Sequence, residues 1–420
     1  MRKISLAIAG AVLVLLSRPG LAQDRASGAT AEKSRQITIL VSIDGFRAEY
    51  LDRGITPNLT ALAVRGVRAR MQPSFPSVTF PNHYTLLTGK VPDHHGIVGN
   101  RFEDETGTRV FGGEDRADSR NPRWWNGAVP LWATAEAQGI GTAHFFWLTT
   151  GVDRAGKPPA RYRPYDPKLP VGEEPGELLK WLDAPAPDQP RFLTLYFYPV
   201  DHEGHDHGTH SPELEAALRQ VDSAIGTLVE GLRQRGLLAR TNIVVVSDHG
   251  MTDVPRDHVV MLDDLVKPGT FRTISLGAYA TVDAANGIAL KRVSKRLVGR
   301  HGHVECWRRE ALPARFHYGA NARIAPIVCL ADKGWNISTR AERAKSPPRD
   351  GPVFGDHGFD PADPDMAAIF IAAGPAFRHG VRLPPFDNVD VYPLLADVIG
   401  VTPQPGDGSI RSLLPALAEP

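Results

Sequence analysis

The sequence predicts an α/β protein, a layered α/β/α sandwich with a mostly parallel central sheet and an inserted cap region. Two observations predict this class. Apolar runs rich in β-branched residues recur along the chain, and their near-continuous apolar character is typical of strands covered on both faces. Amphipathic helical patterns lie between these runs, and strands that alternate with helices favour a layered, mostly parallel sheet.

The predicted elements follow from these patterns. Strands are expected at Ile37 to Ile43, Phe192 to Tyr198, Asn242 to Val246 and Ala367 to Ala372. Helices are expected at Pro57 to Arg65, Asn82 to Thr88, Pro212 to Arg235 and Val389 to Ile399. The pattern from Pro212 is the clearest, because its leucine, valine and isoleucine residues recur every three or four positions.

The composition changes after the third predicted strand. From about Val254 the chain becomes richer in Arg and Gly, with short alternating segments. We therefore expect a catalytic core at 37–253 and 346–420, interrupted by an inserted cap at 254–345. The two cysteines, Cys306 and Cys329, lie within this insertion. In an oxidising compartment they could form one disulfide, and otherwise they are two separate buried residues.

The N-terminus has the layout of a secretory signal peptide. Arg2 and Lys3 precede an apolar run, which ends before the small residues of Pro19 to Ala22. We expect a signal peptide at 1–22 and a flexible leader at 23–36, with an uncleaved N-terminal anchor as the alternative. No later run approaches the length of a transmembrane helix. The expected destination is outside the cytoplasm, either periplasmic or secreted.

The charge balance limits the possible partners. A formal net charge of +1 argues against a dedicated nucleic-acid surface, since proteins that bind along nucleic acids usually carry a clear basic excess. No stable nucleic-acid partner is expected. A small phosphate-containing substrate stays compatible with this balance, because metal ions alone can bind phosphate. The sequence does not predict the oligomeric state.

Asp and His residues follow the predicted strands. Asp44 ends the first strand, Asp201 and His205 follow the second, Asp248 and His249 follow the third, and His357 precedes the fourth. In open α/β sheets ligands bind beyond the carboxyl ends of strands, so these side chains should converge. Mixed imidazole and carboxylate ligation suits zinc better than magnesium or calcium.

Each residue has a simpler interpretation when it is taken alone. Asp44 could be a turn residue, Asp248 could cap a helix, and His357 could be an ordinary loop histidine. The joint pattern at the strand ends favours a site for two divalent cations.

Thr79 lies next to a predicted helix start. Pro81 suits the first helical turn, which places Thr79 at the helix N-terminus, where free N–H groups attract an anion such as phosphate. Thr79 could be an ordinary N-cap or a metal-activated nucleophile. The predicted metal site nearby favours the nucleophile.

These motifs together resemble the nucleotide pyrophosphatase/phosphodiesterase family of the alkaline phosphatase superfamily. The resemblance covers most of the chain after the leader and is weakest in the insertion. The matching segments are Ile43 to Arg47, Thr79 to Tyr84, His95 to Asn100, the Asp201 and His205 pair, Ser247 to Met251 and Gly355 to Phe359.

The resemblance implies a role for each matching residue. One Zn²⁺ would be held by Asp201, His205 and His357, and a second by Asp44, Asp248 and His249, with Thr79 beside it. Asn100 and the backbone N–H of Phe80 would donate to a phosphoryl oxygen. The nearby His202, His207 and His210 do not fit the spacing as well as His205.

The resemblance also implies a mechanism and a substrate class. Thr79 would attack phosphorus and form a phosphothreonine intermediate, as in hydrolysis of a nucleoside triphosphate to a monophosphate and pyrophosphate. Phe80 and Tyr196 match positions that stack a nucleobase, although Tyr196 could instead be a core aromatic residue.

Three alternative functions stay open at this point. Two are enzymes of the same superfamily: a phospholipase C-like or choline-phosphodiester hydrolase, and a phosphomonoesterase with Arg47 as a charged clamp. The third is an exported binding module without catalysis.

Overall fold

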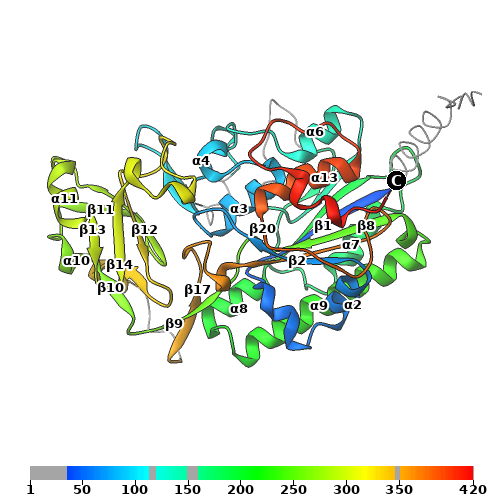
Figure 1. Ribbon diagram of the computed structural model, residues 1–420, viewed down its shortest axis with the longest axis horizontal. Coiled ribbons are helices and arrows are strands. Elements are labelled where there is room, and N and C mark those ends of the chain that lie inside the picture. Colours follow the sequence, from blue (N-terminus) through cyan, green and yellow to red (C-terminus); the bar gives the residue numbers. More distant parts are fainter. Residues whose placement is uncertain (1–35, 113–119, 149–158, 346–350, 420) are drawn as a thin grey trace, which may run out of the picture.

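The computed structural model describes residues 36–112, 120–148, 159–345 and 351–419 (Figure 1). The predicted signal peptide lies outside these residues, as does all of the predicted leader except Gln36. Among the described residues, no helix combines the length and the apolar character that crossing a bilayer requires.

The central sheet has nine strands within the described residues, in the order β19-β2-β18-β8-β1-β7-β5-β6 with β20 beside β2. From β8 to β6 all neighbours are parallel, while β18 runs antiparallel to both β8 and β2. The strands are β1 (Ile37–Ile43), β2 (Val67–Gln72), β5 (Thr142–Phe145), β6 (Tyr162–Arg163), β7 (Phe192–Phe197), β8 (Thr241–Val246), β18 (Ala368–Ala373), β19 (Val381–Arg382) and β20 (Phe386–Asp387).

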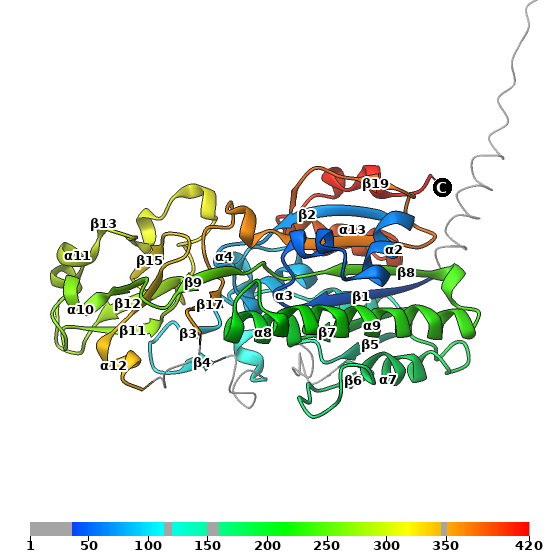
Figure 2. The same cartoon turned by 90° about the horizontal axis from the view of Figure 1, so that it is seen from below.

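Helices cover both faces of this sheet (Figures 1 and 2). One layer contains α2 (Pro57–Arg65), α7 (Glu174–Trp181), α8 (Pro199–His207) and α9 (Pro212–Gln234). The other contains α3 (Thr79–Thr88), α4 (Pro92–His95), α6 (Leu131–Ala137) and α13 (Val391–Ile399). Every residue of β1, β7, β8 and β18 is buried between them. The predicted α/β/α sandwich with a mostly parallel sheet is therefore confirmed.

A second sheet lies beside the first, at the left in Figure 1. It is antiparallel, in the order β11-β12-β15-β14-β13, and has its own apolar core. Its strands are β11 (Phe271–Ser275), β12 (Tyr279–Ala284), β13 (Gly299–His301), β14 (Val304–Arg308) and β15 (Ile327–Ala331). The short helices α10 (Leu262–Leu265), α11 (Leu290–Leu297) and α12 (Arg340–Arg343) accompany it. The predicted boundaries of the insertion, 254 and 345, stay a prediction.

A disulfide joins two strands of the second sheet. Cys306 on β14 lies directly opposite Cys329 on β15, and their sulfur atoms are bonded. Of the two interpretations of the cysteines, the structure shows the bridge.

Smaller elements connect the two sheets. The ribbon of β9 (Thr252–Pro255) and β17 (Val353–Asp356) lies between them, and the hairpin of β3 (Arg101–Glu103) and β4 (Val110–Gly112) contacts β11. Strand β10 (Val259–Met261) pairs with β16 (Asn336–Ser338).

Candidate metal centre and active site

The segments after β1, β7, β8 and β17 meet at the carboxyl edge of the central sheet. The turn after β1 approaches α8 very closely, because a Cβ placed on Gly45 would lie 2.9 Å from Cα of Asp201. Gly45 also has a φ of 65°, a conformation that glycine adopts without strain. Glycine at this position therefore lets the Asp44 turn pack against the helix that carries Asp201.

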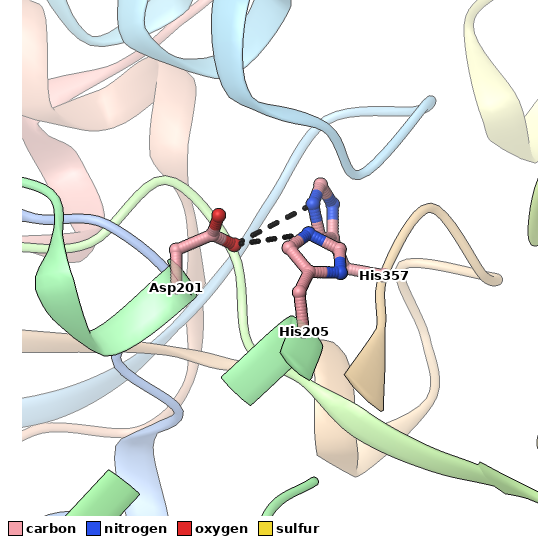
Figure 3. Close-up of side chains that lie close together, drawn as sticks. All are labelled: Asp201, His205 and His357. Carbon is pink, nitrogen blue, oxygen red and sulfur yellow. Dashed lines mark ion pairs between the residues drawn. The ribbon is translucent and has the colours of Figure 1, made fainter. Parts of the chain in front are cut away.

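Asp201, His205 and His357 form one group of side chains (Figure 3). Asp201 and His205 are one helical turn apart on α8, and His357 reaches them from the segment after β17. Nε2 of His205 and Nε2 of His357 lie 3.4 and 3.6 Å from Oδ1 of Asp201. Three donor atoms therefore face one point, as a metal ion requires.

Asp44, Asp248 and His249 form the adjoining group. Nε2 of His249 lies 3.5 Å from Oδ1 of Asp44 and 3.0 Å from Oδ2 of Asp248. The two groups are continuous, because the ligand atoms of Asp44, Asp201 and His249 also lie close together. The rings of His249 and His357 stack with centroids 3.5 Å apart. The structure thus brings together all six predicted ligands.

The three histidines are held in the same way. Each Nδ1 lies at hydrogen-bond distance from a backbone carbonyl, which can only accept, so Nδ1 carries the proton and Nε2 is left as a free donor to a metal. The bonds run from His205 to Gly355 O at 2.8 Å, from His249 to Gly250 O at 2.9 Å and from His357 to Ser77 O at 2.9 Å.

The carboxylates supply the second sign that this donor set fits a cation. Oδ1 of Asp44, Oδ1 of Asp201 and Oδ2 of Asp248 are buried and have no hydrogen-bond partner within the part of the chain that the structure describes. A buried carboxylate oxygen without a partner is strongly unfavourable. Divalent cations would remove that penalty, and the mixed nitrogen and oxygen donors fit zinc.

The pKa shifts of Asp44 and His357 agree with a site for cations. Burial raises the pKa of Asp44 well above its ordinary value, and the nearby charges of Asp248 and Asp201 raise it further. Burial also lowers the pKa of His357 well below its ordinary value, with the charges of His249 and His205 adding to the effect. A neutral His357 is ready to bind a metal, while Asp44 needs added positive charge to stay ionised.

Thr79 is the first residue of α3 and does not cap it. The N-cap residue is Val78, without a side-chain capping bond. Oγ1 of Thr79 instead lies 3.3 Å from Nε2 of His249. The interpretation of Thr79 as an ordinary N-cap is therefore wrong, and the helix begins three residues earlier than the predicted Asn82. The interpretation of Asp248 as a helix cap also fails, since Asp248 is fully buried and the next element is the strand β9. Asp44 does lie in a turn and His357 in a loop, and both side chains nevertheless join the site.

Asn100 and Phe80 are linked to each other. The backbone N–H of Phe80 donates to Oδ1 of Asn100 at 2.9 Å. This bond takes up the Phe80 N–H and leaves the Nδ2 amide group of Asn100 as the donor. The Phe80 ring is partly exposed, packs edge-on against Phe111 and lines a cavity next to the site.

Tyr196 lies underneath the site and not in the cavity. Its side chain is 5% exposed, and its hydroxyl donates a 2.6 Å hydrogen bond to Oδ2 of Asp44. The ring also packs edge-on against His83 and Tyr165. Such a buried ring has no face open to a nucleobase, so the predicted stacking role of Tyr196 does not fit its place in the structure. Its hydroxyl orients Asp44.

His83 is a site residue that the sequence did not single out. It is fully buried, with Nε2 at 2.8 Å from Oγ of Ser42 and Nδ1 at 2.9 Å from the carbonyl oxygen of Thr79. Nδ1 is also 3.4 Å from Oδ2 of Asp248. The available signal was its position four residues after Thr79, on the same face of α3.

The remaining candidate site residues form ion pairs outside the metal-ligand groups. Arg47 forms a 2.6 Å ion pair with Asp365 and does not line the cavity, which disfavours its role as a phosphate clamp. His202 and His207 lie on the exposed side of α8 and pair with carboxylates of that helix.

Fold and site together define a class of protein, an α/β/α enzyme with clustered carboxylates and imidazoles beside a threonine hydroxyl at the strand ends. The chain belongs to the type I phosphodiesterase / nucleotide pyrophosphatase family, whose model matches residues 38–360. The resemblance seen in the motifs is thereby confirmed, and the chain is an enzyme of this type.

Relatives are similar over most of the chain. A bis(5′-adenosyl)-triphosphatase of Bos taurus is 34% identical over 91% of this chain and 82% of its own length. An uncharacterized pyrophosphatase/phosphodiesterase of Schizosaccharomyces pombe is 35% identical over 90% of this chain and 79% of its own length. The chain spans only 43% of ectonucleotide pyrophosphatase/phosphodiesterase family member 3 of Bos taurus, at 35% identity.

A solved structure of a family member shows the same fold. Murine ectonucleotide pyrophosphatase/phosphodiesterase 5, in an inactive form in complex with AMP, is 31% identical and superposes with a TM-score of 0.84. The match covers 91% of this chain and 100% of the murine one.

Proposed function

We propose that the chain hydrolyses phosphodiester or phosphoanhydride bonds of nucleotides, with two Zn²⁺ ions and Thr79 as the nucleophile. One observation carries this proposal. The Thr79 hydroxyl lies 3.3 Å from Nε2 of His249, where three imidazoles converge with three carboxylate oxygens that have no hydrogen-bond partner in the described part of the chain.

The two side-chain groups divide the ligands. Asp201, His205 and His357 would hold one Zn²⁺, and Asp44, Asp248 and His249 the other. Bound zinc supplies Lewis acidity, which lowers the pKa of a neighbouring hydroxyl and stabilises charge on phosphoryl oxygens. Tyr196 keeps Asp44 oriented, and its pKa is raised well above the ordinary value by burial and the charge of Asp44, so its hydroxyl stays a donor.

The reaction proceeds in two displacements. The Thr79 oxygen forms a bond to phosphorus as the bond to the leaving oxygen breaks, and the hydroxyl proton passes to solvent. The threonine then carries the phosphoryl group with its nucleoside. Water attacks this phosphothreonine, releases the nucleoside 5′-monophosphate and restores the hydroxyl. Nδ2 of Asn100 donates to a nonbridging oxygen, and the N-terminus of α3 favours the same negative charge.

Nucleotides are the proposed substrates for two reasons. The relatives include a bis(5′-adenosyl)-triphosphatase and a structure in complex with AMP. The partly exposed ring of Phe80, next to the nucleophile, offers a face for a nucleobase. The expected reactions are a nucleoside triphosphate to monophosphate plus pyrophosphate, and cleavage of dinucleotides. Export by the segment 1–22 is part of the proposal, and two relatives above are named ectonucleotide enzymes.

A panel of three chromogenic esters tests the proposal. The chain without residues 1–22 is purified, loaded with zinc and given p-nitrophenyl thymidine 5′-phosphate, p-nitrophenylphosphorylcholine and p-nitrophenyl phosphate. We expect the thymidine ester to have the highest kcat/KM. Preference for the choline ester would identify a choline-phosphodiester hydrolase, and preference for p-nitrophenyl phosphate a phosphomonoesterase. No turnover of any ester would favour a binding module.

A further inference from the structure

The segment 254–345, which contains the second sheet, carries an excess of positive charge. It has 16 Lys and Arg residues against 8 Asp and Glu, a formal net charge of +8. The rest of the chain has 32 Lys and Arg against 39 Asp and Glu and carries −7, so that the total is only +1. A charge asymmetry of this size between two parts of one chain indicates that the basic part contacts a polyanion.

One helix of this segment concentrates cations that have no acidic partner. Four basic side chains of α11 are exposed, and we call them the α11 patch: Lys291, Arg292, Lys295 and Arg296. None of the four makes an ion pair with another residue that the structure describes. Other arginines of the second sheet do have such partners, since Arg300 pairs with Asp332 and Arg308 with Glu310.

The helix turns these cations away from the protein. Val293 and Leu297 are buried in the apolar core of the second sheet, and Leu290 packs against that core. The helix lies at the end of the second sheet that is farthest from the central sheet (Figures 1 and 2). The described wall of the cavity next to the metal centre includes none of the four cations. The patch therefore faces solvent and is separate from the candidate active site.

The arrangement of the patch opposes the helix that carries it. Lys291 and Lys295 are one helical turn apart, as are Arg292 and Arg296, and like charges at this spacing repel each other. Lys291 and Arg292 lie in the first turn, where the helix dipole disfavours cations, and that turn has no acidic residue. Helix α9, by contrast, has two glutamates in its first turn. A partner with clustered negative charge would remove both penalties.

A membrane surface fits this patch better than a nucleic acid does. The patch lies at one end of the molecule, so a flat anionic surface can touch it while the acidic remainder of the chain stays at a distance. The low net charge of the whole chain already argues against a nucleic-acid surface. Val298, directly after α11, is also 38% exposed. An exposed apolar side chain next to clustered cations is typical of segments that bind anionic membranes.

We propose that the α11 patch docks the protein on a membrane surface that displays anionic phospholipid headgroups. This inference goes beyond the proposed hydrolysis and does not depend on it. Docking through α11 would leave the cavity next to the metal centre open, because the patch and the cavity share no residue.

Sedimentation with lipid vesicles tests the proposal. The chain without residues 1–22 is mixed with vesicles of equal parts phosphatidylglycerol and phosphatidylcholine, or of phosphatidylcholine alone, at about 50 mM and about 500 mM salt. The patch variant replaces all four cations of α11 with Gln. The matched control removes the same charge from exposed residues outside the segment 254–345, as Arg65→Gln/Arg70→Gln/Lys168→Gln/Arg382→Gln.

We expect the wild type and the control variant to bind the anionic vesicles at low salt. Their partition coefficients should exceed that of the patch variant at least tenfold, because each basic residue near such a surface contributes roughly a fivefold factor. Binding should be lost at high salt and with phosphatidylcholine alone. The double variant Lys291→Gln/Lys295→Gln should lose at least threefold, so that the result does not depend on the folding of the fourfold variant alone.

Equal partition of the wild type and the patch variant would overturn the inference. An equal fall in the patch and control variants would also overturn it, because net charge and not the α11 patch would then explain the binding. A wild type that binds a duplex oligonucleotide at low salt and no vesicle would identify a nucleic-acid surface instead. Turnover of p-nitrophenyl thymidine 5′-phosphate in solution should be unchanged in the patch variant. Failure of the wild type to turn over this ester would refute the proposed function and leave the docking inference standing.

Discussion

The hydroxyl of Tyr196 donates a 2.6 Å hydrogen bond to Oδ2 of Asp44, and Oδ1 of the same carboxylate is buried and has no hydrogen-bond partner among the residues that the structure describes. One oxygen of Asp44 is thus held by the protein, and the other is free for a cation. A ligand whose orientation is fixed in this way loses little freedom on binding a metal.

Tyr196→Phe tests this relationship. Phenylalanine keeps the ring and removes the donor, so Asp44 loses its orienting bond. We expect zinc affinity or kcat/KM to fall about 10- to 100-fold, by the same factor for p-nitrophenyl thymidine 5′-phosphate and for bis(p-nitrophenyl) phosphate, which has no nucleobase. A stacking role predicts the opposite, because phenylalanine stacks as well as tyrosine. Wild-type rates in this variant would therefore contradict the assignment to Asp44.

Phe80→Ala tests where the nucleobase binds. Loss of the partly exposed ring should weaken the transition state for the thymidine ester by about 1–3 kcal/mol. The kcat/KM for bis(p-nitrophenyl) phosphate should change much less. Steady-state kinetics with both esters give the comparison, and an equal loss for the two would assign Phe80 to packing against Phe111.

Much of the fold could be predicted from local sequence, and the reason is physical. β1, β7, β8 and β18 are buried on both faces, so they read as continuous apolar runs with bounds correct to within one residue. β2 (VRARMQ) was not predicted because arginines alternate with its apolar residues. β5 and β6 were not predicted because they are too short to show a pattern.

The site was predictable in part. The metal-ligand candidates follow strands or lie at positions i and i+4 of a helix. The rule that ligands bind beyond the carboxyl ends of strands therefore predicts that they lie close together. The place of Tyr196 could not be read in this way. A strand aromatic points to one face or the other according to the register of β7, and only the neighbours across the sheet decide whether that face is a cavity or a carboxylate.

Glu174 provides a test of the fold that is independent of metals. It lies in the first turn of α7, is 2% exposed, and its Oε2 has no hydrogen-bond partner among the described residues. Burial raises the pKa of Glu174 to about 9, and the charge of Arg163 opposes this effect. Because the folded pKa lies above the unfolded one, this carboxyl group favours the folded state most at low pH. That contribution is lost as the pH rises toward 9.

Glu174→Gln removes the titration while keeping the shape. We expect the melting temperature to be nearly unchanged at pH 5 and to rise by at least about 2 °C at pH 8. The exposed neighbour Glu173→Gln is the control and should show no such pH dependence. Equal shifts at both pH values would mean that Glu174 is ionised in the folded chain.

The disulfide should stabilise the second sheet. Cys306 and Cys329 are 23 residues apart, and closing a loop of that length is worth about 3 kcal/mol in the chain-entropy account. In the Cys306→Ala/Cys329→Ala double variant, amide hydrogen exchange of β12, β14 and β15 should become faster, while β1 and β7 keep their protection. Uniformly faster exchange across both sheets would show that the two sheets unfold as one unit.

The turnover of zinc-loaded Thr79→Ala with p-nitrophenyl thymidine 5′-phosphate, with zinc content measured on the same sample, tests most directly whether Thr79 is the nucleophile. We expect two zinc ions per chain, as in the wild type, and a fall in kcat of at least about a thousandfold. A variant that holds two zinc ions and turns over within tenfold of the wild type would show that Thr79 is not the nucleophile.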